Sequence, residues 1–168
     1  TPIRTTPVAL PEPAIAKGFV EVEQDGRRVP TDEPQDYEVE VLDNFIARVE
    51  VQRPWAYVLP QERRGIANKL QQHGIKVQLL REDVEVESEA SIIEEFAQED
   101  RPFQGHRMVT VTTRLDAADR SLEAGDYIIP VDQPLGNLVV AMLEPVAEDS
   151  LATWNFFDDE MAEGATHS

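Results

Sequence analysis

Half of the prolines in this chain lie in its first 35 residues. The chain contains twelve prolines, and six of them occupy positions 2, 7, 11, 13, 30 and 34. Because proline fixes φ and has no amide hydrogen, this stretch is excluded from forming a long helix or a central strand. One alternating segment, Gly18–Gln24, predicts a short strand followed by a turn at Asp25-Gly26. We therefore predict that residues 1–35 form an extended arm or linker.

From Tyr37 onward the pattern is typical of β-strands, because apolar residues recur at every second position as far as Val51. We expect a turn or bulge within this run at Asp43-Asn44. A short apolar segment, Trp55–Leu59, predicts the next strand, which stops at Pro60.

The segment Gln61–His73 predicts an amphipathic helix, because Ile66 and Leu70 recur on one face. Gly74 is placed for the left-handed residue that ends a helix. Alternation resumes over residues 75–79. Strand, helix and strand joined by short connections predict a βαβ unit with a right-handed crossover.

The second half of the chain predicts three more strands, over residues 84–92, 108–115 and 127–131, and a second helix over Leu135–Leu143, which ends before Pro145. An aromatic segment, Trp154–Phe157, follows, and we predict a flexible tail over residues 160–168. The predicted fold is α+β, with a mixed sheet of about five to seven strands, two main helices and the Pro-rich arm. A β-sandwich is the alternative if Leu135–Leu143 forms a strand. The predicted domain covers residues 36–159.

Charge limits the partners of this chain. Fifteen basic and 33 acidic residues give a net charge of −18, which repels phosphate backbones and anionic membranes, so we predict no nucleic-acid and no membrane partner. The chain has no cysteine, which excludes disulfides, thiol catalysis and Cys-ligated metal.

Four groups of residues are candidates for chemistry. The histidines, at positions 73, 106 and 167, lack the His-x-x-Glu spacing of a zinc hydrolase, and the serines at 91, 121 and 150 lack a nucleophile elbow. Glu85, Glu87 and Glu89 share one face of a predicted strand, which suits either Ca²⁺ or, more simply, a solvent-facing surface. The aromatic residues are candidates either for a sugar- or peptide-binding platform or for a core or domain interface; they are Trp55, Tyr57, Trp154, Phe156 and Phe157.

Several short motifs occur in an order that resembles the region after the catalytic domain of large bacterial zinc carboxypeptidases, in the carboxypeptidase A-like superfamily. The resemblance covers residues 53–159. The motifs are Arg53–Pro60, Leu70–Ile75, Phe103–His106, Ala124–Tyr127, Gln133-Pro134, Leu143–Pro145 and Trp154–Phe156.

The resemblance implies a non-catalytic C-terminal domain. The zinc ligands, the carboxylate-clamping arginine and the glutamate base of the family have no counterpart here, so it implies no catalytic residue, cofactor or metal in this chain. Zinc and peptide hydrolysis would belong to a catalytic domain N-terminal to residue 1. That domain is the expected partner, with Trp154, Phe156 and Phe157 as candidate contacts. The resemblance also favours an extracytoplasmic location. The alternatives are an independent peptide- or glycan-binding module and, less favoured, a hydrolase in its own right.

Overall fold

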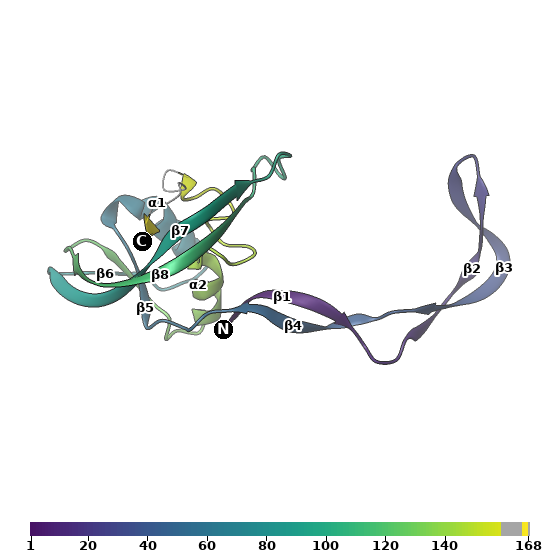
Figure 1. The fold of residues 1–168 in the computed structure, drawn as a ribbon, viewed down its shortest axis with the longest axis horizontal. Helices are drawn as coiled ribbons and strands as arrows, with labels where there is room; N and C mark the ends of the chain where they lie inside the picture. The colour runs from purple at the N-terminus through teal and green to yellow at the C-terminus, as the bar shows by residue number, and fades with distance from the viewer. Residues whose placement is uncertain (159–165, 168) are drawn as a thin grey trace. The chain divides into compact units, whose positions relative to one another are not determined.

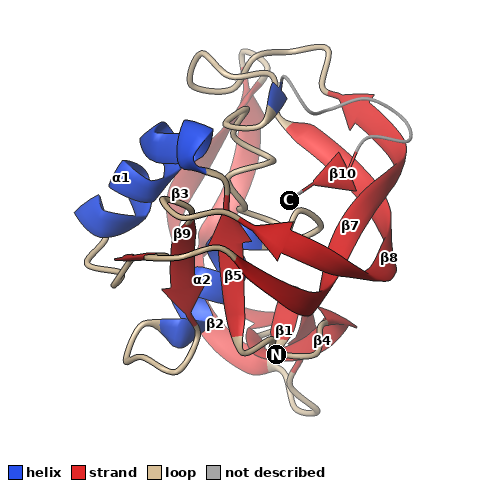
Figure 2. Ribbon diagram, turned by 90° about the vertical axis from the view of Figure 1, so that its left-hand side faces the viewer, coloured by secondary structure: helices blue, strands red, loops and turns tan. Residues whose placement is uncertain are grey.

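The structure is a computed structural model that describes residues 1–158, 166 and 167. Strands dominate it, as Figure 2 shows, and the described residues contain two α-helices. The chain divides into two compact units: Thr1–Arg4 with Val49–Ser168, and Thr5–Arg48. The elements are β1 (Pro2–Ala9), β2 (Ala14–Gln24), β3 (Arg27–Val39), β4 (Leu42–Glu50), β5 (Ala56–Leu59), a 3₁₀ turn (Gln61–Arg63), α1 (Arg64–Gln72), β6 (Gln78–Leu79), β7 (Val84–Gln98), β8 (Val109–Leu122), β9 (Tyr127–Pro130), α2 (Gly136–Leu143) and β10 (Thr166–His167).

The larger unit contains two three-stranded sheets. In the first, β9 lies between β5 and β6 and is antiparallel to both, so β5 and β6 run parallel to each other without being neighbours. In the second, β7 lies between β10 and β8, again with antiparallel pairing. Figure 1 shows β7 and β8 as a long twisted ribbon. The predicted single mixed sheet is therefore wrong, because the described strands form small separate sheets whose registered pairings are antiparallel.

The first predicted helix is confirmed, as a 3₁₀ turn that continues into α1. Its apolar face is buried through Ile66 and Leu70, and each such burial contributes about 1.5–3 kcal/mol. Gly74 has φ of 82°, which a glycine adopts at low cost, and the helix ends there. The strand expected over residues 75–79 is reduced to Gln78–Leu79. The Ile75 amide instead donates to the Leu70 carbonyl, and the Gly74 amide donates to the Gln71 carbonyl. These two bonds close the end of the helix around the left-handed glycine.

The second predicted helix is also confirmed, so the condition for a β-sandwich is not met. Most of α2 is buried, which fits a short helix that is apolar nearly all round. Its first residue, Gly136, lies against the Arg53 guanidinium and the Val131 carbonyl oxygen, where a Cβ atom would overlap both. Arg53 donates to the Val131 carbonyl and to Asn137 Oδ1, so this arginine ties the start of β5 to the start of α2.

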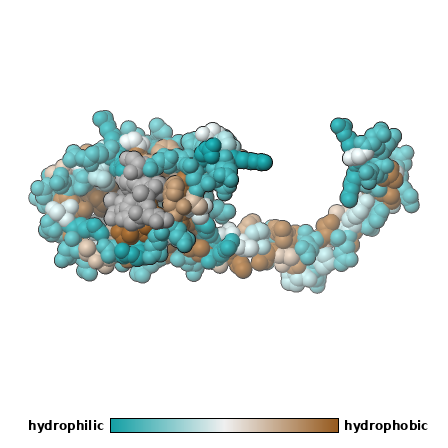
Figure 3. Space-filling view, turned by 45° about the horizontal axis from the view of Figure 1, so that its top comes forward, coloured by the Kyte–Doolittle hydropathy of each residue, from teal (hydrophilic) through white to brown (hydrophobic). Residues whose placement is uncertain are grey.

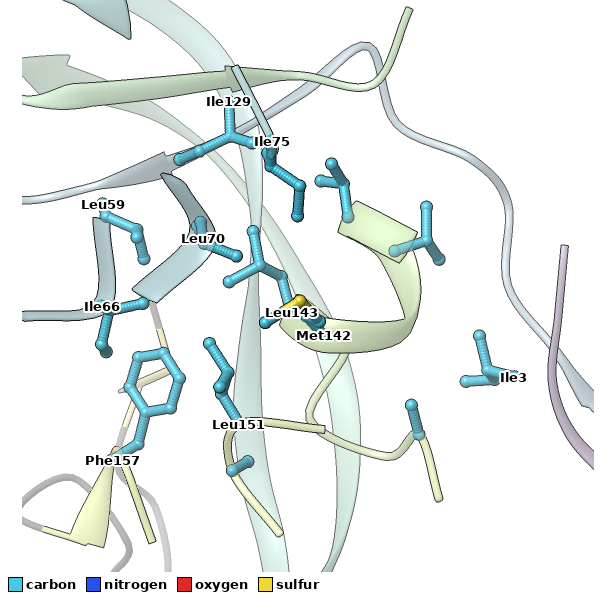
Figure 4. Close-up of a cluster of buried hydrophobic side chains, with 14 of the residues drawn as sticks. Ile3, Leu59, Ile66, Leu70, Ile75, Ile129, Met142, Leu143, Leu151 and Phe157 are labelled. Carbon is cyan, nitrogen blue, oxygen red and sulfur yellow. The ribbon is translucent and has the colours of Figure 1, made fainter. Parts of the chain in front are cut away.

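One hydrophobic core holds the larger unit together. Side chains from the β5–β9–β6 sheet, from β7 and β8, from both helices and from the C-terminal segment contribute to it. Figure 4 shows ten of them labelled, among them Ile3 from β1 and Phe157 from the C-terminal segment. Ile93, Ile129 and Leu70 have no solvent exposure.

The smaller unit contains two two-stranded ribbons, β2–β3 and most of β1–β4. β2 pairs antiparallel with β3, and the predicted turn at Asp25-Gly26 is confirmed, with φ of 53° and 73° at the two residues. Such positive φ values are those of a type I′ hairpin turn. β1 pairs with β4. Proline is tolerated here because each strand of a two-stranded ribbon is an edge strand. The predicted arm is thus paired β-structure.

Of the two alternatives at Asp43-Asn44, the turn is wrong, because both residues lie within β4, and the bulge stays a prediction. The break falls between β3 and β4, at residues 40 and 41, next to the point where the chain changes its strand partner from β2 to β1. The Leu10 amide donates to the Val41 carbonyl there.

The smaller unit covers Thr5–Arg48, so it extends beyond residue 35, where the predicted arm ended. Most of the predicted tail, at 160–165 and 168, lies outside the described residues. Thr166 and His167 form β10, paired with Ile92 and Ser91 of β7.

Candidate interaction surface

Trp154 is the centre of an aromatic cluster on the larger unit. Its ring centroid lies 5.5 Å from that of His106, edge to face, and 6.3 Å from that of Phe103. Its indole Nε1–H donates to Asp149. Trp154 is half-buried, whereas Phe103 is 54% exposed. We call these three residues, Phe103, His106 and Trp154, the Trp154 cluster.

A tight turn places Phe103 and His106 side by side. The two residues exchange backbone hydrogen bonds of 2.8 and 2.9 Å, and the residues between them, Gln104 and Gly105, have φ of 51° and 87°. A non-glycine residue at positive φ costs energy, and such positions concentrate where the local geometry has a use. The turn presents both side chains to Trp154.

Asn155 holds this turn to the C-terminal segment. Its side-chain amide donates to the Arg107 carbonyl at 2.9 Å and to Asp158 at 3.1 Å, and its Oδ1 lies 3.2 Å from His106 Nδ1. Asn155 has φ of 69°, which asparagine tolerates better than most residues. The cluster is therefore fixed in place although much of it faces solvent.

The structure separates the three predicted contact residues. Phe156 is 38% exposed, and the Lys69 ammonium lies 5.9 Å from its ring centroid. Phe157 has no exposure and lies in the core, on the side of Ile66 and Leu151 in Figure 4. A fully buried ring offers no surface to a partner, so Phe157 is removed from the candidate contacts. Trp154 and Phe156 stay predictions.

The predicted aromatic platform is divided in the same way. Trp55 is 79% exposed. Tyr57, two positions later in the chain, packs against the core, and its hydroxyl donates to the Glu144 carboxylate. Burial is the main cause that raises the pKa of Tyr57 far above its ordinary value, and the hydrogen bond and charge of Glu144 add to it. Burial also raises the pKa of Glu144, while the hydrogen bond from Tyr57 opposes that rise. The pair is a structural contact with a neutral phenol.

The candidate metal ligands are not brought together. Within residues 1–158, 166 and 167, no group of three His, Asp or Glu side chains is close enough to hold a metal ion. Glu85, Glu87 and Glu89 are exposed on β7, as expected for a solvent-facing surface, and Glu87 pairs across the sheet with Asp119. His73 is exposed at the end of α1, where its amide caps the helix. The absence of zinc from this chain stays a prediction.

The predicted serines have ordinary surroundings where described. Ser150 is buried and bonds the Thr153 amide and hydroxyl and the Pro145 carbonyl, which closes a turn of the C-terminal segment. Ser121 pairs with Glu85 and Ser91 with Leu115 in the β7–β8 ladder. On the other side of β7, Ser91 pairs with His167 of β10.

Sequence reasoning missed the exposed hydrophobic residues of the smaller unit. None of residues 5–48 is buried, yet eight large apolar side chains there are 38–65% exposed. They are Ile15, Phe19, Val22, Val29, Val39, Leu42, Phe45 and Ile46. Figure 3 shows hydrophobic residues on the surface of this unit. The sequence did contain a signal for them, because apolar residues alternate in this segment. The segment has too few strands to form a second layer that would bury those residues.

Comparisons with protein-family models, with curated proteins and with solved structures found no match for this chain. Among the described helices, none has the length and apolar character needed to cross a membrane.

Proposed function

We propose that this chain is a non-catalytic accessory domain of a zinc metallocarboxypeptidase, and that it packs on the catalytic domain of the same polypeptide. The observation that carries the proposal is the Trp154 cluster. Two of the motifs that give the chain its resemblance, Phe103–His106 and Trp154–Phe156, lie 48 residues apart in the chain and meet in this cluster on the surface. Aromatic residues held rigidly at a surface are typical anchors of protein interfaces.

The other motifs support the proposal differently, because they account for contacts inside the domain. Tyr57 of the first motif bonds Glu144 of the sixth. The Gln133 side chain bonds the backbone of Lys76, next to the second motif, through both its oxygen and its nitrogen. The resemblance therefore divides into residues that hold this fold together and a small exposed set around Trp154.

We also propose that the larger unit is an α+β domain with one βαβ unit, as the sequence pattern predicts. The connection β5–α1–β6 joins two strands that run parallel on either side of β9, which is a βαβ unit with an inserted antiparallel strand. The proposal assigns zinc, the substrate carboxylate clamp and the general base to the catalytic domain, and it takes an extracytoplasmic location from the resemblance. The parent reaction would be the release of C-terminal residues from peptides.

The test compares Trp154→Ala in two polypeptides: the present chain and the longer chain with its N-terminal catalytic domain. Loss of an interface anchor costs more than about 2 kcal/mol at a hot spot, so the longer chain should lose more stability than the present chain does. Phe156→Ala should act in the same direction but less. Equal losses in both polypeptides would make Trp154 a purely internal residue and would count against the proposal.

A second candidate function has its own observation. Trp55 is 79% exposed, which favours a peptide- or glycan-binding module that uses this ring. Titration of the present chain with soluble oligosaccharides and peptides, followed by tryptophan fluorescence, tests it. A binding signal that disappears in Trp55→Ala and persists in Trp154→Ala would favour the module over the accessory domain.

A further inference from the structure

Two carboxylates flank the Trp154 cluster and are bonded to it. The Asp149 carboxylate accepts the hydrogen bond of the Trp154 indole. The Asp158 carboxylate accepts a hydrogen bond from the side chain of Asn155, which also contacts the cluster. Both aspartates are exposed. The segment that contains them, residues 145–158, has three acidic residues and no basic one, so negative charge lies directly at the aromatic rings.

The side-chain hydrogen-bond donors of this surface are already used within the chain. Asn155 donates through its nitrogen to a backbone carbonyl and to Asp158. Its oxygen is therefore the atom that faces His106, so Nδ1 of the neutral imidazole carries the ring hydrogen and donates it to Asn155 at 3.2 Å. The Trp154 indole hydrogen is donated to Asp149. One hydrogen on Trp154, one on His106 and two on Asn155 are thus all bonded.

The groups that remain free on this surface are acceptors. They are the faces of the Trp154 and Phe103 rings, Nε2 of His106 and the other lone pairs of the two carboxylates. Phe103 is 54% exposed and Trp154 is half-buried, so part of each ring faces solvent. The face of an aromatic ring is negative and attracts cations. All of these groups favour a ligand that carries positive charge and donates hydrogen bonds.

The same set of groups disfavours an anionic ligand. A carboxylate or a phosphate would meet two negative charges, and the side-chain hydrogens counted above would not be free to bind it. The basic residue next to the cluster, Arg107, does not reverse this, because its guanidinium donates to the backbone carbonyl of Asp100 at 2.9 Å. The cluster therefore complements a cation.

The arrangement fits a guanidinium better than an ammonium. A guanidinium is planar, stacks on aromatic rings and presents five N–H donors in fixed directions, whereas an ammonium is a compact and strongly hydrated point charge. The acceptors of this surface lie around the rings in several directions. A single guanidinium can contact a ring and donate to more than one of them.

We propose that the Trp154 cluster binds an arginine side chain of the catalytic domain. The guanidinium lies against the aromatic rings and donates to His106 Nε2 and to the carboxylates of Asp149 and Asp158. The inference deepens the proposed function and rests on it for the identity of the partner. It defines the chemical class of the partner group, which an aromatic anchor alone does not. Because Asn155 already holds the cluster in place, binding needs little rearrangement of this chain.

The experiment titrates the present chain with N-acetyl-arginine amide, and separately with N-acetyl-citrulline amide, a neutral probe of nearly the same shape. NMR follows the indole N–H signals of Trp55 and Trp154, the two tryptophans of the chain, at constant ionic strength, and Trp55→Phe assigns them. The Trp154 signal should shift and saturate with the arginine probe. The Trp55 signal is the reference for an indole outside the cluster and should not saturate. The citrulline probe should bind about fivefold more weakly or worse, because it has no charge.

Two variants test the named contacts. Asp149→Asn keeps an acceptor for the Trp154 indole but removes the charge, so it should weaken binding of the arginine probe about twofold to threefold. Its matched control is Glu148→Gln, which removes the same charge from the exposed neighbouring residue and should leave the affinity nearly unchanged. Phe103→Ala removes an exposed ring and should weaken binding about twofold or more.

Three results would overturn the inference. A shift that does not saturate with the arginine probe up to about 100 mM would mean that the cluster has no site for it. Equal affinity for the citrulline probe would show that charge plays no part. Equal weakening in Asp149→Asn and Glu148→Gln would reduce the effect to general attraction by an acidic chain.

The longer chain with its N-terminal domain tests the partner. There the arginine of the catalytic domain should occupy the cluster, so the Trp154 signal should no longer respond to the probe. An equal response in both polypeptides would refute this partner.

Failure here is distinguishable from failure of the proposed function, whose test measures stability. A Trp154→Ala change that destabilises the longer chain more, with no probe binding by the present chain, would refute the arginine site and keep the proposed function. Probe binding by the present chain, with equal losses of stability in both polypeptides, would refute the proposed function and the partner named here.

Discussion

The hydroxyl of Tyr57 donates a hydrogen bond to the carboxylate of Glu144, and both groups are partly removed from water. The contact joins β5 to the residue that ends α2, 87 positions later in the chain. It therefore connects the first sheet of the larger unit to its second helix. Each group depends on the other, because a buried donor or acceptor without a partner is costly.

The stability of the larger unit should depend on pH through Glu144. Its pKa is raised in the folded chain, so the folded state holds this proton more tightly than the unfolded state does. The corresponding stability is fully present below the ordinary pKa of 4.5 and is lost as pH rises through the higher folded value. Glu144→Gln keeps an acceptor for Tyr57 but carries no charge at any pH. The free energy of unfolding of this variant, relative to that of the natural chain, should therefore increase as pH rises from 4.5 through the folded pKa of Glu144.

Urea unfolding at several pH values, from about 4 to about 8, measures this difference. Glu148→Gln is the control, since Glu148 is exposed nearby. A constant difference between Glu144→Gln and the natural chain across the range would contradict the prediction. Tyr57→Phe should destabilise the chain at neutral pH by on the order of 1–3 kcal/mol, towards the lower end because water still reaches the carboxylate.

Gly136→Ala should destabilise the chain, by about 1–3 kcal/mol for an overpacked site. The added methyl group would overlap the Arg53 guanidinium and the Val131 carbonyl, which are bonded to each other at this point. Gly65→Ala is the matched control, because Gly65 lies in α1 with open space around its Cβ position. That change should stabilise the helix by about 0.4–1 kcal/mol. Two thermal melts that shift in the same direction would refute this pair of predictions.

Adjacent phenylalanines should respond very differently to truncation. Phe157→Ala removes a fully buried ring from the core and should cost about 3–5 kcal/mol. Phe156→Ala removes a ring that is 38% exposed and that contacts Lys69, so its cost in the present chain should be small, about 1 kcal/mol or less. Chemical denaturation of both variants decides the order. If Phe156→Ala were the more damaging change, the assignment of Phe157 to the core would be wrong.

We expect the chain to bind no stoichiometric zinc. Its sequence has no cysteine and no His-x-x-Glu spacing, and the described residues provide no group of three ligands. Elemental analysis of the purified chain, prepared without chelator, measures the ratio directly. One zinc per chain that survives dialysis would overturn this expectation.

The same chain should release no C-terminal amino acids from peptides. Such hydrolysis needs an activated water and a base beside it, and the sequence has neither the His-x-x-Glu spacing of a zinc hydrolase nor a nucleophile elbow. The measurement is peptidase activity across a chromatographic peak of the chain. Activity that follows the peak and is abolished by a chelator would make the chain an enzyme.

Local rules in the sequence were sufficient for the two helices and for most strands. Ile66 and Leu70 at helical spacing, with Gly74 after them, determine where α1 lies and where it ends, because these effects act within a few residues. The positive φ at Asp25 and Gly26 follows from residue types that tolerate it. The exposed face of Glu85, Glu87 and Glu89 follows from alternation alone.

Only the tertiary structure decided the burial of Phe157 and the side-chain partners of Trp154 and Tyr57. A short aromatic segment has no period that tells buried from exposed positions, so the burial of Phe157 beside the exposed Phe156 depends on how the segment packs against Ile66 and Leu151. The partner of Tyr57 lies 87 residues away, and the turn that brings Phe103 to Trp154 connects two strands whose length was underestimated. The sequence by itself determined the local elements and the alternation of the ribbon, since these depend on neighbours along the chain. Contacts between distant segments decided which apolar residues are buried in the core. They also decided that the apolar residues of Thr5–Arg48 stay exposed, because no other segment of that unit packs on them.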